Sequence, residues 1–262
     1  MLDDWIYSNS AWLSSSVFIL CGLVVSGFFV VVVTRLISAE TRHIHNEFTL
    51  ATVANIAVLY TVLLAFIAVA AWEDLSKASD LADREAGIVQ DLYVDAGGFS
   101  DKGLTSQLQN ELRDYIDAVV NREWPVQQAG SIARAASPAL RNFRATLASF
   151  QPKTSGDAIV MQEMLRSLNN LYDARRSRLD AAAGHIPGAV WGVVVFLGLL
   201  TIGFMALLSM RSRWMHFALA AGLATAMVVV VALIVQLDYP FRGEISVSSE
   251  PFQQVLKDVG PG

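Results

Sequence analysis

Four uncharged apolar runs dominate this chain, and each is long enough to cross a lipid bilayer. They cover residues 11–33, 49–72, 186–210 and 216–237. A hydrocarbon core of about 30 Å is crossed by about 20 helical residues. Because lipid offers the backbone no hydrogen-bond partners, such runs must be helices, which close their backbone hydrogen bonds internally. The sequence therefore predicts an all-α membrane protein with four transmembrane helices and the lipid bilayer as its partner.

The charge content of the chain agrees with this class. Only 16% of its 262 residues are charged and the mean hydropathy is +0.45, whereas a soluble domain carries about 25% charged residues. The net charge is −5 and no stripe of Lys or Arg is present to neutralise phosphates. We therefore expect no nucleic-acid partner.

Motifs for catalysis and for cofactors are missing from the sequence. The chain has no G-x-S-x-G, no phosphate-binding glycine loop, no H-E-x-x-H and no C-x-x-C. His43 and His45 are two residues apart, so on a helix they point in different directions, and no carboxylate cluster completes a metal site with them. We expect no enzyme activity, no cofactor and no metal.

The spans divide the chain into four segments. Residues 1–72 form the first transmembrane pair, residues 73–185 a helical soluble insert, residues 186–237 the second transmembrane pair and residues 238–262 a short polar tail. Nothing breaks the helical pattern after the second span before the Gly97-Gly98 pair, so this span is expected to continue unbroken into the insert.

The rest of the insert shows three further helical stretches. One apolar stripe runs over residues 104–119 and stops near Trp124-Pro125. Ser137-Pro138 is typical of an N-cap followed by proline, and it opens a short helix. A last helix over residues 159–179 leads back to the membrane, so the insert is predicted to be a helical bundle or stalk.

One face of the second span is the first candidate site. Seven of its residues follow i, i+3/i+4 spacing, namely Thr52, Asn55, Leu59, Val62, Phe66, Val69 and Glu73. The face is polar at its start, apolar in the middle and acidic at its end, as in a pore-lining stripe whose hydrophobic constriction gates by dewetting. Alternatively, Asn55 and the threonines hydrogen-bond across helices.

Basic residues in the two short connections between spans form a second candidate site. They are Arg35, Arg42, Arg211 and Arg213. In a symmetric oligomer they would repeat as a basic collar that concentrates anions at an entrance. The alternative is topology anchoring, because positive loops stay in the cytoplasm, which would put the insert outside. Arg175, Arg176 and Arg178, close before the third span, favour the opposite orientation.

Several short segments carry a resemblance to a known family. They are His45-Asn46-Glu47-Phe48, residues 57–66 with Ala71-Trp72-Glu73, Arg84-Glu85-Ala86, Asp114-Tyr115, Glu123-Trp124-Pro125, residues 175–179, Ile186-Pro187 and Trp191. With these segments, the chain resembles the bestrophin-like family of largely uncharacterised bacterial multi-pass membrane proteins. The stretch from Tyr60 to Glu73 is the most specific part.

The resemblance implies distant similarity to bestrophins, which are pentameric anion channels whose second span lines a narrow hydrophobic neck. It implies a homo-oligomer, a pentamer by analogy, in a bacterial inner membrane, with Val62, Phe66 and Val69 at the constriction. It also implies a cytosolic insert, opposite to the charge of the short loops. The chain lacks an acidic segment like the calcium clasp of animal bestrophins, so calcium gating is not expected.

These observations lead to one functional hypothesis and one alternative. The hypothesis is an oligomeric channel that conducts small anions passively, with the second span lining the path. The alternative is a non-conducting membrane scaffold or sensor whose helical insert binds a partner. An ion-coupled transporter is less consistent with the sequence, because the spans carry no charge in their middle.

Overall fold

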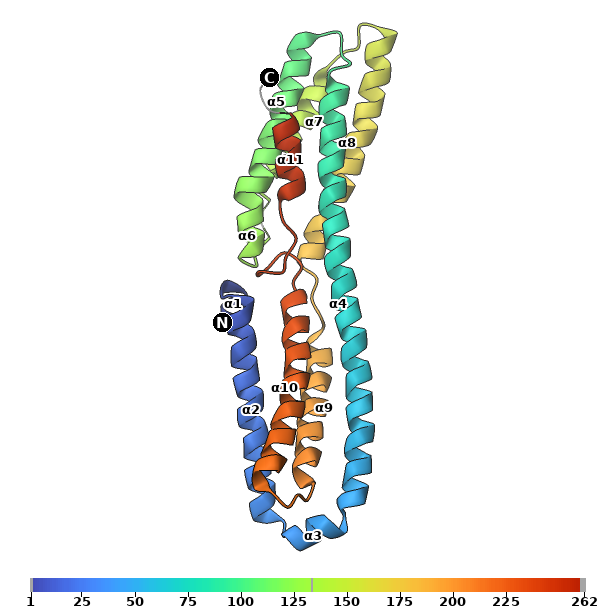
Figure 1. Cartoon of the computed structure of the whole chain (residues 1–262). Helices are drawn as coiled ribbons and strands as arrows, with labels where there is room; N and C mark the ends of the chain where they lie inside the picture. The colour runs from blue at the N-terminus through green and yellow to red at the C-terminus, as the bar shows by residue number, and fades with distance from the viewer. Residues whose placement is uncertain (1, 133, 260–262) are drawn as a thin grey trace. The chain divides into compact units, whose positions relative to one another are not determined.

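The computed structural model describes residues 2–132 and 134–259, and every regular element in these ranges is a helix. Four helices are long and apolar enough to cross a membrane: α2 (Ala11–Leu36), α4 (Asn46–Ala96), α9 (Gly188–Leu207) and α10 (Arg213–Leu237) (Figure 1). The predicted all-α fold with four transmembrane helices is thereby confirmed.

The chain divides into two compact units. The first, here called the transmembrane unit, comprises Met1–Glu73 and His185–Asp238. The second, here called the bundle unit, comprises Asp74–Gly184 and Tyr239–Gly262. The helix α4 contributes to both, because its 51 residues run without a break from Asn46 to Ala96. As the sequence predicts, α4 ends at the Gly97-Gly98 pair, where the helical pattern stops.

The transmembrane unit contains α1 (Leu2–Ser8), α2, α3 (Ala39–Ile44), the first part of α4, α9 and α10. Helix α2 packs on α10 and on α9. On the inner side of α4, Tyr60, Leu64 and Ile67 pack in one buried cluster with residues of α9 and α10. Large apolar side chains such as Phe28 and Phe196 are exposed, which suits a surface solvated by lipid.

Close helix contacts in this unit occur at particular glycines. A Cβ atom added to Gly22 of α2 would lie only 2.8 Å from Val228 of α10, and one added to Gly198 of α9 would lie 3.2 Å from the Tyr60 hydroxyl. A methyl group at Gly22 would therefore force Val228 to move, and one at Gly198 would press on the Tyr60 hydroxyl.

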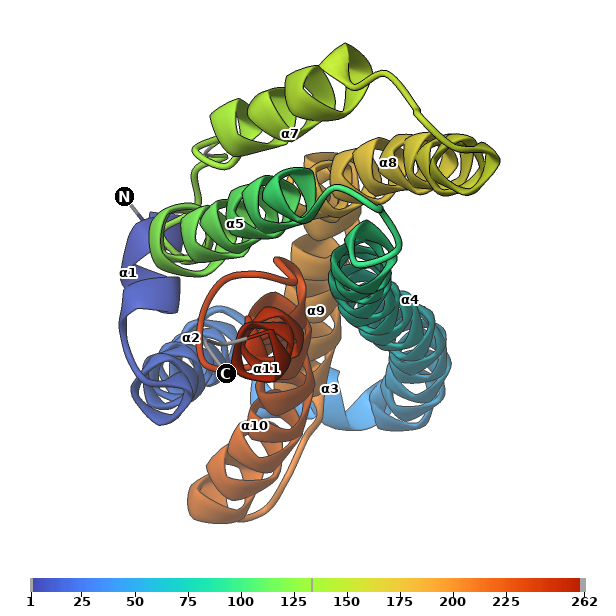
Figure 2. The same ribbon diagram turned by 90° about the horizontal axis from the view of Figure 1, so that it is seen from above.

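The bundle unit contains the second part of α4 with α5 (Lys102–Ala118), the π-helical turn η1 (Val119–Glu123), α6 (Trp124–Gln128), α7 (Ser137–Ser149), α8 (Ser155–Ala182) and α11 (Glu250–Asp258). Figure 2 shows α7 running alongside α5, and these two helices are in contact. Residues from all these helices form a single apolar core, including Leu92, Leu112, Phe143 and Leu168.

Two boundaries in the bundle unit differ from the sequence prediction. The helix does not stop near Trp124-Pro125, because α6 follows η1 directly at Trp124. Pro125 lies in the first turn of α6, where no amide hydrogen is needed. Ser137 is the first residue of α7 and Ala136 is its N-cap, so the predicted serine cap is wrong by one position.

The C-terminal segment adds to the bundle core. The sequence predicts only a short polar tail over residues 238–262, but α11 lies within this segment and its Phe252 and Val255 are buried. The ring of Trp124 lies 5.5 Å from that of Phe241 and 5.7 Å from that of Phe252, between centroids. The segment therefore supplies apolar surface that closes the core around Trp124.

Candidate functional site

Four charged side chains are buried together in the bundle unit. They are Glu85 of α4, Glu123 of η1, and Arg175 and Arg178 of α8, and none is more than 5% exposed. We call these four residues, with the Tyr115 hydroxyl of α5, the buried charge cluster. Two guanidinium groups and two carboxylates leave no net charge, which is the condition under which buried ions are tolerated.

The pairs in the buried charge cluster have short, direct geometry. Arg175 donates one hydrogen bond to each carboxylate oxygen of Glu123, over 2.6 and 2.9 Å. Arg178 donates from Nε to Glu85 Oε2 over 2.7 Å and from Nη2 to Glu85 Oε1 over 3.3 Å. The Tyr115 hydroxyl donates to Glu85 and accepts from Arg175, so it joins the two pairs. Each carboxylate oxygen accepts at least one of these bonds.

Neighbouring groups complete the cluster. The backbone amide of Ala136 donates to Glu123 over 2.7 Å, and Arg178 donates to the side-chain carbonyl of Gln127 over 3.0 Å. The Arg178 guanidinium also lies 5.1 Å from the ring centroid of Trp124. This contact stabilises a cation that has lost its water.

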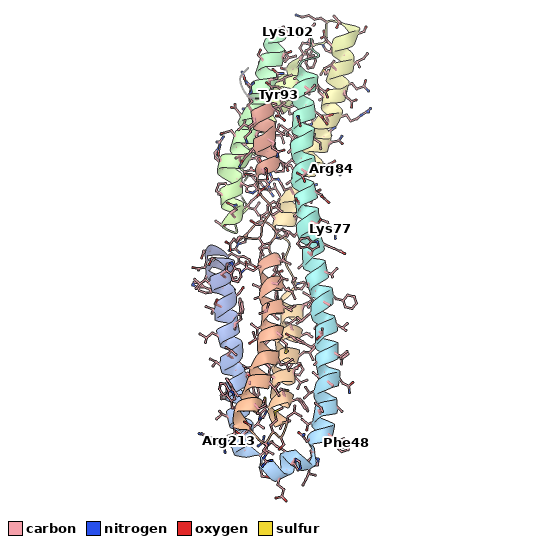
Figure 3. The ribbon with its side chains drawn as sticks, in the orientation of Figure 1. Phe48, Lys77, Arg84, Tyr93, Lys102 and Arg213 are labelled. Atoms are coloured by element: carbon pink, nitrogen blue, oxygen red, sulfur yellow. The ribbon has the colours of Figure 1, made fainter. Side chains whose placement is uncertain are left out.

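The local helix register places these side chains. Arg175 and Arg178 are three residues apart, so they share one face of α8. A π-helical turn adds a residue to the helical repeat, and such turns recur at functional sites. Glu123 is the last residue of η1 and is fully buried. The neighbouring Arg84, labelled in Figure 3, is exposed although Glu85 is buried.

The electrostatics of the cluster hold its groups in fixed protonation states. Burial, reinforced by Glu85, raises the pKa of Tyr115 well above its ordinary value of 10.0. Burial acts to lower the pKa of Arg178, but the charge and hydrogen bonds of Glu85, together with Tyr115, act in the opposite direction, and the pKa of Arg178 is raised. The phenol therefore stays neutral and the arginines stay charged. Every carboxylate oxygen of the cluster accepts a hydrogen bond. The cluster therefore holds the helices of the bundle unit together and does not present a reactive group.

The buried charge cluster is not apparent as one feature in the sequence. Four of the segments that carry the family resemblance meet there, since they contribute Glu85, Tyr115, Glu123 and the two arginines. The sequence does carry one signal, which is a charged residue at a position where the helical pattern predicts a core residue. Glu85 interrupts the apolar stripe of Ala78, Ala82, Val89 and Leu92. Arg175 and Arg178 continue the apolar stripe of Met164, Leu168 and Leu171.

The predicted pore-lining face of α4 is turned away from the other helices of its unit. Leu59, Phe66 and Val69 are 66%, 72% and 56% exposed. Asn55 is also exposed and donates to the carbonyl of Ala51, one turn earlier in the same helix, over 2.9 Å. Thr52 does the same to Phe48 over 2.8 Å. Within one chain each of these side chains donates one hydrogen bond to its own helix, and the face packs against no other described helix of the transmembrane unit.

The predicted basic collar lies where the two short connections meet. Arg42 of α3 donates to the carbonyl of Leu208 over 3.3 Å, and the amide of Ser209 donates to Asn46 Oδ1 over 2.8 Å. Arg213, which begins α10 and is labelled in Figure 3 with Phe48, and Arg211 beside it are exposed. The remaining member, Arg35, lies in the last turn of α2.

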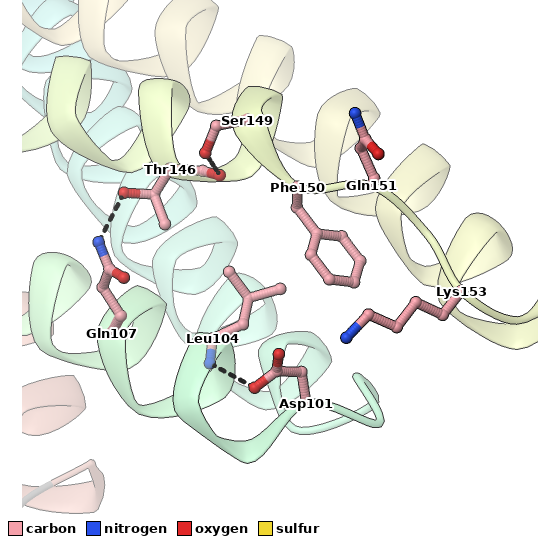
Figure 4. Close-up of a pocket in the computed structure, with 8 residues that line it drawn as sticks. All are labelled: Asp101, Leu104, Gln107, Thr146, Ser149, Phe150, Gln151 and Lys153. Carbon is pink, nitrogen blue, oxygen red and sulfur yellow. Dashed lines mark hydrogen bonds between the residues drawn. The ribbon is translucent and has the colours of Figure 1, made fainter.

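A polar cavity of about 490 Å³ lies between α5 and α7 (Figure 4). Its groups already have local roles: Asp101 caps α5 by accepting from Gly103 and Leu104, and Gln107 bonds Thr146 over 3.1 Å. Lys153 extends into this cavity. Among the described residues, no three His, Cys, Asp or Glu side chains are grouped as metal ligands.

The helices and their composition define a multi-pass helical membrane protein. Residues 18–252 match the bestrophin-like domain, so the chain belongs to the bestrophin-like family. A comparison with curated proteins finds no match.

Solved structures share this fold. Two single-substitution variants of a bestrophin homologue from Klebsiella pneumoniae match this chain. One variant matches with a TM-score of 0.68 at 12% identity, covering 95% of this chain and 100% of the homologue. The other variant matches with a TM-score of 0.70 at 11% identity, covering 97% of this chain and 99% of the homologue. A crystal structure described as a membrane protein matches with a TM-score of 0.70 at 13% identity, covering 95% of this chain and 99% of the other. At such identities the likeness concerns the fold.

Proposed function

We propose that this chain forms a homo-oligomeric channel in a bacterial inner membrane, a pentamer by analogy with bestrophins, and conducts small anions passively. The residues lining the path are Thr52, Asn55, Leu59, Val62, Phe66, Val69 and Glu73. The observation that carries the proposal is the exposure of this face in the single chain, with Phe66 at 72%. Around a central axis the face forms a hydrophobic constriction between polar ends.

The polar residues support a wet path rather than a lipid-facing surface. An amide such as Asn55 is costly in hydrocarbon even when one of its donors is used. Water in an axial path, or α4 of the neighbouring subunit, satisfies its remaining hydrogen-bonding groups. The opposite side of α4 is apolar and already buried against α9 and α10, so only the Asn55 face is available to a path.

The basic collar supports anions as the permeant species. Arg35, Arg42, Arg211 and Arg213 repeat in every subunit of a symmetric oligomer. A ring of positive charge at an entrance raises the local anion concentration.

Conductance in reconstituted bilayers tests the proposal. We expect Phe66→Ala to raise the basal conductance severalfold, because removing the ring widens and wets the constriction. The matched control is Phe196→Ala, which removes an exposed phenylalanine of α9 and leaves the conductance unchanged. Absence of conductance in the wild-type protein and in both variants would refute the channel and favour the scaffold.

Passage of cations is a second candidate, and the acidic end of the face favours it. Glu73 ends the stripe, and Asp74, Asp80 and Asp83 follow on the same helix. The reversal potential in a salt gradient separates the two candidates. A reversal potential near the chloride equilibrium potential supports anions, and Arg213→Gln should then move it toward zero. A reversal potential near the cation equilibrium potential that shifts with Glu73→Gln supports the second candidate.

A further inference from the structure

A second cavity of the bundle unit, of about 550 Å³, has a basic lining that the channel proposal does not use. It is lined by the loop before α7, the start of α7 and the C-terminal half of α8. Its volume falls in the range of small-ligand sites, about 300–1,000 Å³. The charged lining residues are Arg134, Arg141, Arg175 and Arg176 with Asp173 and Asp180.

Three of these guanidinium groups are available to a ligand. Arg175 is engaged with Glu123 in the buried charge cluster. Arg134, Arg141 and Arg176 are exposed and form no side-chain hydrogen bond or ion pair with any described residue. Arginines on a protein surface usually point into water separately, but here they surround one cavity from three chain segments.

The start of α7 adds a hydroxyl donor to the cavity. Ser137 is the first residue of this 13-residue helix and lies in the cavity lining. The backbone amides there are already used, because the Ala136 amide donates to Glu123 over 2.7 Å and the Ser137 amide donates to the carbonyl of Arg134 over 3.2 Å. The Ser137 hydroxyl, whose contact with Arg175 is long at 3.4 Å, supplies a further donor.

We propose that this cavity binds a phosphate-bearing anion. Three guanidinium groups outnumber the two lining carboxylates, so the cavity carries excess positive charge. They approach from the loop, from α7 and from α8, which suits a tetrahedral oxyanion better than a planar carboxylate. Guanidinium pairs phosphate oxygens bidentately, with fixed geometry. The phosphate comes either from a free small molecule or from a lipid headgroup, and the site does not depend on conduction.

Binding to the full-length protein in detergent tests the site. The probes are inorganic phosphate and dioctanoyl phosphatidic acid, titrated calorimetrically at constant ionic strength. The test variant is Arg134→Gln/Arg141→Gln. The matched control, Arg122→Gln/Arg166→Gln, removes the same charge from exposed residues of surface ion pairs outside the cavity. Because Arg134 and Arg141 have no partner to lose, the test variant keeps its fold, which circular dichroism verifies.

We expect at least one probe to bind the wild type and the control equally, and the test variant at least about tenfold more weakly, because charge-assisted hydrogen bonds are lost. Arg141→Lys, which keeps the charge, should bind between these limits. Binding of inorganic phosphate identifies a free ligand, and binding of the lipid probe alone identifies a headgroup. If neither probe binds, or if the test variant and the control bind alike, the site is refuted.

Discussion

At the scale of single residues, the buried charge cluster distinguishes this bundle from one held by apolar packing alone. Buried ion pairs contribute little net stability compared with apolar substitutes, but removing one partner strands a charge. Arg178 is fully buried and contacts both carboxylates, Glu85 at 2.7 Å and Glu123 at 3.5 Å. Removal of Arg178 therefore takes an ion-pair partner from both carboxylates of the cluster.

We expect Arg178→Met to destabilise the bundle unit by about 3–5 kcal/mol, because Glu85 is left buried without its main donor. Arg166→Met, which removes an exposed surface partner of Glu163, should change stability by less than about 1 kcal/mol. Thermal unfolding in detergent, followed by circular dichroism, measures both. Equal melting temperatures for the two variants would contradict a structural role for the cluster.

The raised pKa of Tyr115 makes one contribution to stability depend on alkaline pH. A folded-state pKa above the unfolded value means that the neutral phenol is favoured by folding, so this stability is complete below pH 10.0 and is lost as the pH rises above it. Tyr115→Phe should flatten the alkaline loss of melting temperature. A variant with the same steep loss as the wild type would show that other groups cause it.

At the scale of elements, the start of α8 is fixed by a reciprocal cap. The Thr154 hydroxyl accepts from the amide of Asp157 over 3.0 Å, and Asp157 accepts from the Ser100 amide and hydroxyl, both over 2.9 Å. The cap therefore connects the first turn of α8 to the turn that follows α4. Anions at a helix start are also favoured by the helix dipole.

The pKa of Asp157 is lowered, first by the hydrogen bond from the Ser100 backbone and next by Thr154. A folded-state pKa below the unfolded value means that this contribution is present above the ordinary pKa of 3.8 and is lost as the pH falls through the folded value. We expect Asp157→Asn to weaken the acid dependence of the melting temperature below about pH 4. Identical acid profiles for both proteins would refute this.

At the scale of the whole molecule, the exposed face of α4 is the surface at which the proposed oligomer would assemble. An interhelical hydrogen bond from an amide in the membrane is worth about 0.6–2 kcal/mol. We therefore expect Asn55→Leu to reduce assembly more than folding, as measured by mass in detergent. Thr61→Val is the control, since Thr61 is exposed on α4 and bonds its own helix at Ala57. An unchanged oligomer in Asn55→Leu would contradict the prediction.

The sequence alone determined the helical class, the four spans and the unbroken course of α4, because lipid solvation forces a local pattern that needs no knowledge of distant residues. The membership of the family also followed from short segments of the chain. The predicted cap at Ser137 is off by one residue, which is the usual uncertainty of a helix end. The sequence does not predict the helix that continues through Trp124-Pro125, since a π-helical turn changes the register without a local sequence signature.

Only the tertiary structure brought Glu85 and Glu123, 38 residues apart, together with the arginines of α8, which follow them by 52 to 93 residues. It also placed Phe241 and Phe252 against Trp124 and gathered Arg134, Arg141 and Arg176 around one cavity. Periodicity reports which side of a helix is apolar, but it does not report which helix lies opposite. Which side chains are buried, and which charges pair between distant segments, depends on the neighbouring helix. That neighbour is decided only by packing in three dimensions.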